Sequence, residues 1–327
     1  MVRSSKIQIS KIVFYWAVLT VAFAVFWTFF LNFAQLTGVG PAFSLAIPVS
    51  LGGISAIALY FKHDYQTLEY DDEAYRILRG NRKLEDHKWA EFMECSVVRD
   101  SYGRRKVRAY VERDGRHVEI DPSACGVDPY IFRDFMAERI RSVSAPYKES
   151  AVVGPVFDGL EKEIQRGRAN WVADLSETFR GYQISGEMFP LIARGGTRPK
   201  GFLLSRFVAM TIMPNYDVCL YAHDIGSAGS EEKSRIMRLI RIIETQRDQK
   251  NIKWSWLLLF SDQEPGTSAS RLIETFGNRD VGIGCIDVAT GRIITSPNQL
   301  GKSLSNQMRF HRLMRDLSKR KRFGARA

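Results

Sequence analysis

Two apolar stretches, residues 12–31 and 42–61, constrain the fold of this chain most. Each is about 20 residues long and contains no charged side chain, and about 20 helical residues cross a bilayer core of about 30 Å. Backbone polar groups find no water inside a bilayer, so a stretch that crosses it must be helical. We therefore expect a two-helix transmembrane hairpin over residues 1–65, joined by the short uncharged segment 33–41.

Charged residues on either side of the hairpin predict its orientation. The flanking basic residues all lie on the two outer sides of the hairpin: Arg3, Lys6, Lys11, Lys62, Arg76, Arg79, Arg82 and Lys83. By the positive-inside rule, both termini then lie in the cytoplasm and the chain belongs to a cell membrane as a multi-pass protein with two spans. A cleaved signal peptide is the alternative, but the first stretch is long and a second follows directly.

Neither span contains an acid, a base or a histidine, which a transport path usually needs within the bilayer. We therefore interpret the hairpin as an anchor whose partner is the lipid bilayer. Gly52 and Ala56 stand four residues apart in the second span, a spacing that lets two helices approach closely.

The remaining chain is long enough for two further domains. The formal charge is +11, and much of it lies in residues 302–327, where Asp316 is the one acid. The four cysteines, Cys95, Cys125, Cys219 and Cys285, are widely spaced and form no C-x-x-C pair, so we expect reduced, buried side chains and no zinc site.

Residues 66–144 show short strand patterns followed by one helix. The expected strands are Ala74–Leu78, Trp89–Arg99, Lys106–Arg113 and His117–Ile120, with a turn at Asp100–Gly103. Asp128 and Pro129 suit the start of a helix whose apolar positions are Ile131, Phe132, Phe135, Met136 and Ile140. This pattern resembles the bacterial and archaeal pleckstrin-homology-like (PH-like) domains, which implies a small antiparallel barrel used for packing or binding.

Residues 145–155 read as a linker, and residues 156–301 read as a mixed α/β domain with a central sheet. A long helix is expected from Val156 to Phe179, with an apolar face formed by Phe157, Leu160, Ile164, Trp171, Leu175 and Phe179. The further strands expected are Tyr182–Ile192, broken at Gly186, and Phe202–Met213, Val218–Ala222, Trp254–Phe260, Val281–Val288 and Arg292–Thr295. The further helices expected are Ser268–Phe276 and Glu231–Gln249, the latter with Ile236, Leu239, Ile240 and Ile243 facing inward. Strands that alternate with helices favour a sheet covered by helices.

Three segments resemble strands of restriction-endonuclease-like (PD-(D/E)xK) domains: Gly181–Glu187, Ser205–Ala209 and Asp217–His223. The family's active members use an Asp and a Glu-x-Lys motif to hold Mg²⁺ and position water. Here Arg206 or Phe207 stands at the Asp position, and Tyr221 and His223 stand at the Glu and Lys positions. The resemblance therefore implies the fold without the family's chemistry, because Glu187 is the one acid that agrees.

A relocated metal site is the alternative, with Glu187, Asp217, His223 and Asp224 as its candidate residues and Mg²⁺ or Mn²⁺ as its cofactor. Asp217 and Asp224 also suit the turns at either end of a short strand. We therefore expect no catalytic residues, no metal and no cofactor. Gly282 and Gly284 are not a dinucleotide fingerprint, because the third glycine is missing and no helix follows.

The basic tail, residues 302–327, has apolar residues at helical spacing and basic residues on its other faces. The predicted anionic-surface residues are Arg309, Arg312, Arg315, Lys319, Arg320, Lys321 and Arg322. Anionic lipid headgroups and nucleic acid are the two partners that such a segment fits, and a terminal helix packed on the sheet is the structural alternative.

Together these features predict a membrane-anchored α+β protein with a cytoplasmic, non-enzymatic binding or scaffolding module. The alternatives are a membrane-tethered, metal-dependent nuclease with a rearranged site and a nucleic-acid-binding pseudonuclease. The sequence does not identify a protein partner.

Overall fold

The chain is a mixed α+β protein, and the computed structural model describes residues 2–33, 41–80, 82–112, 115–140, 154–166, 173–197, 216–226 and 232–307. Contacts divide the chain into two compact units. The first unit is Met1–Glu94 with Tyr110–Ile140, and the second is Cys95–Ala109 with Arg141–Ala327. The predicted domain boundaries remain predictions.

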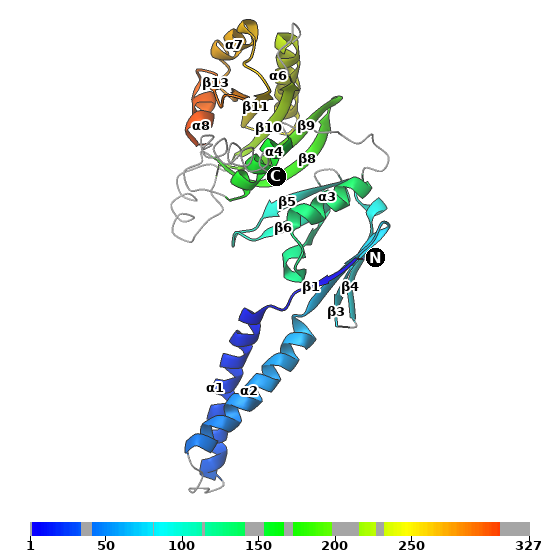
Figure 1. The fold of residues 1–327 in the computed structure, drawn as a ribbon, viewed down its shortest axis with the longest axis vertical. Helices are drawn as coiled ribbons and strands as arrows, with labels where there is room; N and C mark the ends of the chain where they lie inside the picture. Colours follow the sequence, from blue (N-terminus) through cyan, green and yellow to red (C-terminus); the bar gives the residue numbers. More distant parts are fainter. Residues whose placement is uncertain are drawn as a thin grey trace, which may run out of the picture. The chain divides into compact units, whose positions relative to one another are not determined.

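Two long helices that pack side by side and an antiparallel sheet make up most of the first unit (Figure 1). The helices are α1 (Ile9–Phe33) and α2 (Pro41–His63). The sheet has the order β1-β2-β3-β4, formed by β1 (Val2–Ser5), β2 (Gln66–Tyr70), β3 (Ala74–Arg79) and β4 (Arg82–Lys88). The unit also contains η1 (Trp89–Glu91), β7 (His117–Ile120), η2 (Pro122–Cys125) and α3 (Pro129–Ile140).

The helix α3 closes the apolar core of the first unit. Its predicted cap is confirmed, because Asp128 Oδ1 accepts a hydrogen bond from the backbone N–H of Tyr130 at 2.8 Å. Phe132 and Met136 are fully buried, and the ring of Phe132 meets that of Tyr75 edge to face. Ile131, which the apolar pattern placed with them, is 66% exposed.

The expected small barrel is wrong for the part of the chain described, since no sheet there closes into a barrel. Trp89 ends the preceding strand in a tight 3-10 turn, and its ring stacks on Tyr75 while its Nε1–H donates to Asp71 O at 2.9 Å. The expected strand Trp89–Arg99 is therefore broken, and its second half belongs to the second unit, where Val97 lies opposite Thr178.

A twisted mixed sheet with helices on both faces forms the second unit. Its strands run in the order β13-β12-β11-β10-β9-β8-β5-β6. They are β5 (Glu94–Arg99), β6 (Arg105–Tyr110), β8 (Asp174–Ile184), β9 (Glu187–Gly196), β10 (Asp217–Gly226), β11 (Trp254–Ser261), β12 (Val281–Asp287) and β13 (Ile293–Thr295). The helices are α4 (Gly154–Gln165), α6 (Glu232–Gln249), α7 (Thr267–Glu274) and α8 (Gln299–Gln307).

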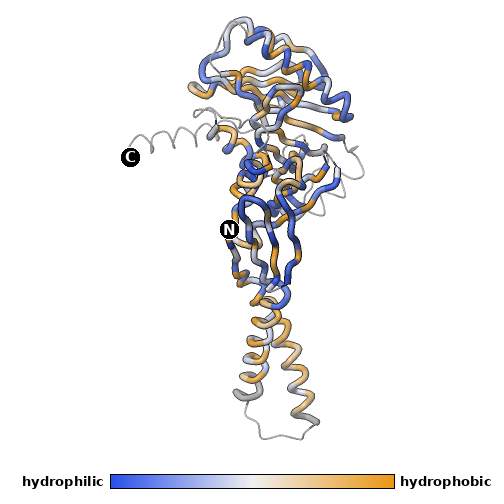
Figure 2. The backbone as a smooth tube through the Cα atoms, turned by 90° about the vertical axis from the view of Figure 1, so that its right-hand side faces the viewer, coloured by the Kyte–Doolittle hydropathy of each residue, from blue (hydrophilic) through white to orange (hydrophobic). Residues whose placement is uncertain are grey.

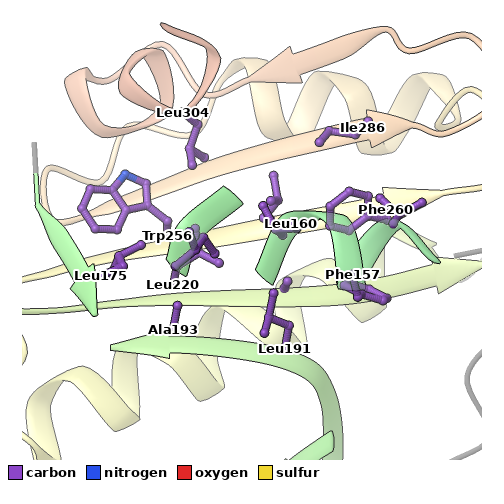
Figure 3. Close-up of a cluster of buried hydrophobic side chains, with 14 of the residues drawn as sticks. Phe157, Leu160, Leu175, Leu191, Ala193, Leu220, Trp256, Phe260, Ile286 and Leu304 are labelled. Carbon is purple, nitrogen blue, oxygen red and sulfur yellow. The ribbon is translucent and has the colours of Figure 1, made fainter. Parts of the chain in front are cut away.

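Strands β10, β11 and β12 are parallel and form the centre of this sheet, while β8, β9 and β13 are antiparallel to their neighbours. Helices α4 and α8 cover one face, where Phe157, Leu160 and Leu304 pack on Leu220, Leu258 and other strand residues (Figure 3). The predicted inward positions of α6 are confirmed, because Ile236, Leu239, Ile240 and Ile243 are buried.

The long helix expected from Val156 to Phe179 is wrong in its second half. The helix α4 ends at Gln165, and the strand β8 begins at Asp174. Leu175 and Phe179 are buried as predicted, but on a strand. A spacing of four residues is about one helical turn and also two strand repeats, so it does not separate the two structures.

Candidate functional site

Many apolar side chains of α1 are exposed, because the rest of the described chain does not cover them. Val21, Phe26 and Phe29 are 64%, 67% and 76% exposed, respectively. Figure 2 shows α1 and α2 largely in the hydrophobic colour. Within the described residues, one helical segment, Ile9–Phe30, is long and apolar enough to cross a bilayer. A second span is not shown by the same criterion.

The two helices approach each other closely at a glycine, as predicted. A Cβ added to Gly52 would lie 2.5 Å from Thr20 Oγ1 and 3.0 Å from Thr20 N, so a larger residue has no room there. Ala56, one turn further on, is fully buried. The indole N–H of Trp16 donates to Val49 O at 3.2 Å across the same interface. Small residues at such a crossing permit backbone-to-backbone packing.

Polar contacts tie the first residues of α1 to the last residues of α2. Tyr60 accepts a hydrogen bond from Gln8 N at 2.7 Å and donates to Lys6 O at 3.2 Å. Asp64 accepts a hydrogen bond from the Tyr15 hydroxyl and pairs with Lys11 at 3.4 Å. Burial tends to raise the pKa of Asp64, but the Tyr15 hydrogen bond and the Lys11 charge outweigh it and hold that pKa below its ordinary value.

A strand ladder then fixes both ends of the helix pair at one level. The strand β1 precedes α1 and pairs antiparallel with β2, which follows α2, so that Ser5 lies opposite Thr67 and Val2 opposite Tyr70. The Ser4 hydroxyl also donates to Cys125 O at 2.8 Å. The N-terminal residues before α1 are therefore part of the folded unit.

The structure separates the four candidate catalytic residues into two places on the second sheet. Asp217 is exposed at the start of β10, opposite Gly196, whereas His223 and Asp224 stand near the other end of that strand. Six residues of strand span about 20 Å. Glu187 begins β9, which runs antiparallel to β10, and its carboxylate pairs with Arg238 of α6.

His223 is 3% exposed and neutral at pH 7. Burial and then the charges of Arg235 and Arg238 lower its pKa to about 4. Its Nδ1 lies 3.0 Å from Met188 O and must donate to it, which leaves the buried Nε2 as an acceptor with no hydrogen-bond partner among the described residues. A base with so low a pKa accepts protons poorly at neutral pH.

Asp224 is tied to the turn that follows it, where its Oδ1 accepts a hydrogen bond from Gly226 N at 2.8 Å. Burial, together with the nearby charge of Asp262, raises the pKa of Asp224. Across the described residues, no group of three His, Cys, Asp or Glu side chains is arranged to hold a metal ion. The expectation that the chain has no catalytic residues remains a prediction.

Several residues singled out from the sequence lie outside the described residues. They are the resemblance segment Ser205–Ala209 with Arg206 and Phe207, and the anionic-surface residues Arg309, Arg312, Arg315, Lys319, Arg320, Lys321 and Arg322. Among the described residues, the four cysteines are free and buried, as expected.

Two features of the structure were missed by reasoning from sequence. The strand β1 is too short and polar to show a period, so only its ladder to β2 reveals it. Gly282 lets α8 cross β12, because a Cβ there would lie 2.6 Å from the carbonyl carbon of Leu300. The sequence signal was a glycine inside an apolar strand, which often marks a close backbone approach.

Comparison of the chain with protein-family models, with curated proteins and with solved structures found no match.

Proposed function

We infer that this chain is an integral membrane protein whose helix pair α1–α2 anchors a non-enzymatic α/β binding module at one face of the bilayer. The observation that carries this proposal is the pairing of β1 with β2 next to a bare apolar helix. Water is a poor solvent for the exposed Val21, Phe26 and Phe29. Lipid is the solvent that suits such a surface.

The ladder supports two spans. Three residues separate Ser5 from Ile9 at the start of α1, and two separate His63 at the end of α2 from Gln66. If α1 crosses the bilayer, the chain must return to reach β2 beside β1, and α2 is the segment that returns. The basic flanks then place both ends of the anchor in the cytoplasm.

The second unit supports a binding role because its candidate catalytic groups are apart or engaged. Asp217 is at one end of β10, Glu187 is paired with Arg238, and His223 is held neutral. The order α4, β8, β9, β10, α6 and β11 is compatible with a restriction-endonuclease-like domain that has lost its motif. A PH-like origin for residues 66–144 rests on the sequence pattern alone.

A membrane-tethered nuclease is the second candidate, and one observation favours it. Glu187, His223 and Asp224 share one end of the β9–β10 pair, where the parallel strands also end. Ligands of open α/β sheets commonly bind beyond the carboxyl ends of the strands.

Two measurements test the proposal. The full chain should stay with membranes after alkaline carbonate extraction, and replacing Val21 by Arg should release it, because a charge at a helix centre costs about 2.5–3.5 kcal/mol on insertion. Extraction of the unaltered chain would contradict the anchor.

Purified full chain should also leave DNA and RNA intact with Mg²⁺ or Mn²⁺. Cleavage that disappears in Glu187→Ala or His223→Ala would instead establish the nuclease.

A further inference from the structure

The four strands of the first sheet end together at the side from which the helices leave. Ser5, Thr67, Leu78 and Lys83 form one rung of the ladder. Gln66, Arg79 and Arg82 form the next rung. The tip of the β3–β4 hairpin therefore lies beside the polar end of α2, where Figure 1 also draws it.

Basic side chains mark these strand ends. Arg82, Lys83 and Lys62 are exposed. Arg79 lies close enough to Asp64 to lower the pKa of that carboxyl group, and its Nε is buried with no hydrogen-bond partner in the described part of the chain. We call Lys62, Arg79, Arg82 and Lys83 the basic collar.

Acids compensate only part of the basic collar. Asp64 is occupied by Tyr15 and Lys11, and Asp86 pairs with Lys83 and with Arg76. No ion pair is found for Lys62 or Arg82 within the described residues. Phosphate groups are the counter-charge that such a surface fits.

Apolar side chains stand among the basic ones. Ile7 is 53% exposed, Phe61 is 42% exposed and Leu84 is 38% exposed. Lys and Arg with apolar neighbours suit the headgroup layer, where stems contact apolar surface and charged ends reach phosphates.

We propose that the basic collar binds the headgroups of anionic phospholipids and so holds the β3–β4 hairpin against the bilayer. This proposal rests on the proposed membrane anchor, because the anchor brings the strand ends to the headgroup level. Lipid is the occupant because the collar continues directly from the ends of α1 and α2. Each Lys or Arg near an anionic surface contributes about 1 kcal/mol, which is about fivefold in affinity.

The test uses the full chain in detergent, equilibrated with equal amounts of phosphatidylglycerol and phosphatidylcholine, with the bound lipids counted by native mass spectrometry. The unaltered chain should retain phosphatidylglycerol preferentially. In the variant Arg82→Gln/Lys83→Gln, the preference for phosphatidylglycerol should fall about fivefold for each charge removed. The preference should also fall steeply as salt rises, because exposed charges are then screened.

The matched control is Lys233→Gln/Arg241→Gln, which removes the same charge from exposed positions of α6. It should keep the preference of the unaltered chain, and so should Arg82→Lys/Lys83→Arg. An unchanged preference in the Gln variant of the hairpin, an equal loss in the control, or a loss in the charge-conserving variant would overturn the proposal. Carbonate extraction of the unaltered chain would refute the anchor separately, since lipid counting in detergent does not require it.

Discussion

The helix α1 and the strand β11 both carry apolar side chains, but those of α1 are exposed and those of β11 are buried. Val21, Phe26 and Phe29 of α1 are more than half exposed, whereas Leu257, Leu258 and Leu259 of β11 are fully buried by neighbouring strands and helices. Both segments are mostly apolar. The strand finds its apolar solvent inside the protein, and the helix must find it outside, which is the physical case for a lipid environment.

The two regions also differ in where their polar side chains make contacts. In the second unit, the buried Gln165 donates from its Nε2 to Val97 O at 2.9 Å and to Thr178 Oγ1 at 3.0 Å, and Arg99 pairs with Asp174. These contacts join β5 to α4 and β8. In the first unit, hydrogen bonds of Tyr60 and Asp64 hold the helix pair together at its end. Further along, the helices meet at Gly52, Ala56 and Thr20, and the indole N–H of Trp16 donates to Val49 O.

The largest expected effect separates the two apolar runs directly. Leu258→Ala should destabilise the second unit by about 2–5 kcal/mol, because it leaves a cavity in a fully packed core. Val21→Ala, which removes two methyl groups from an exposed position of α1, should change the unfolding free energy by less than about 0.5 kcal/mol. Chemical unfolding of the full chain in detergent measures both. A similar loss in the two variants would break the comparison.

A buried histidine should make the stability of the second unit depend on pH. The pKa of His223 is about 4 in the folded chain and about 6.5 when unfolded, so the unfolded state binds more protons between those values. Stability should therefore fall as pH drops from about 6.5 to about 4, by about 3 kcal/mol in total.

The variant His223→Gln should flatten this part of the pH profile, measured as the midpoint of thermal unfolding at each pH. The raised pKa of Asp224 contributes in the opposite sense, since its proton is held more tightly in the folded chain. It is present in both proteins, so their difference isolates His223. His63→Gln, at an exposed position, is the matched control. Parallel profiles for His223→Gln and the unaltered chain would contradict the assignment.

A smaller effect is expected where the helices cross. Gly52→Ala should weaken the packing of α1 on α2 by about 1–3 kcal/mol, because its Cβ has no room beside the backbone of Thr20. Gly53→Ala is the control, since its Cβ would lie 3.6 Å from the nearest atom of Trp16, an ordinary contact. Crosslinking between the helices in detergent, as a function of temperature, measures the difference. Equal losses for the two glycines would show that the close approach is not at Gly52.

Local patterns predicted much of this fold. Alternation and turn residues located β7 and the Asp100–Gly103 turn, and a helical stripe with its cap located α3. The inward face of α6 also followed from spacing. Each of these depends on neighbours within a few residues, where sequence and structure are tightly linked.

Features that depend on distant partners were missed. The strands β5 and β8 pair over a long separation, so no local pattern removed β5 from the expected barrel. The candidate set of Glu187, Asp217, His223 and Asp224 looked compact in sequence, but an extended strand carries Asp217 about 20 Å from His223. Strand β1 is recognisable only through its partner β2.

The most direct test of the central claim is to find on which side of the bilayer Thr37, between α1 and α2, lies. The four native cysteines are buried, so single cysteines introduced at Thr37 and at Tyr102, which is 83% exposed, can be labelled selectively with a membrane-impermeant thiol reagent. In intact cells, Thr37→Cys should react and Tyr102→Cys should react only after the membrane is opened. Labelling of both sites from the same side would contradict the account, because α2 would then not return across the bilayer.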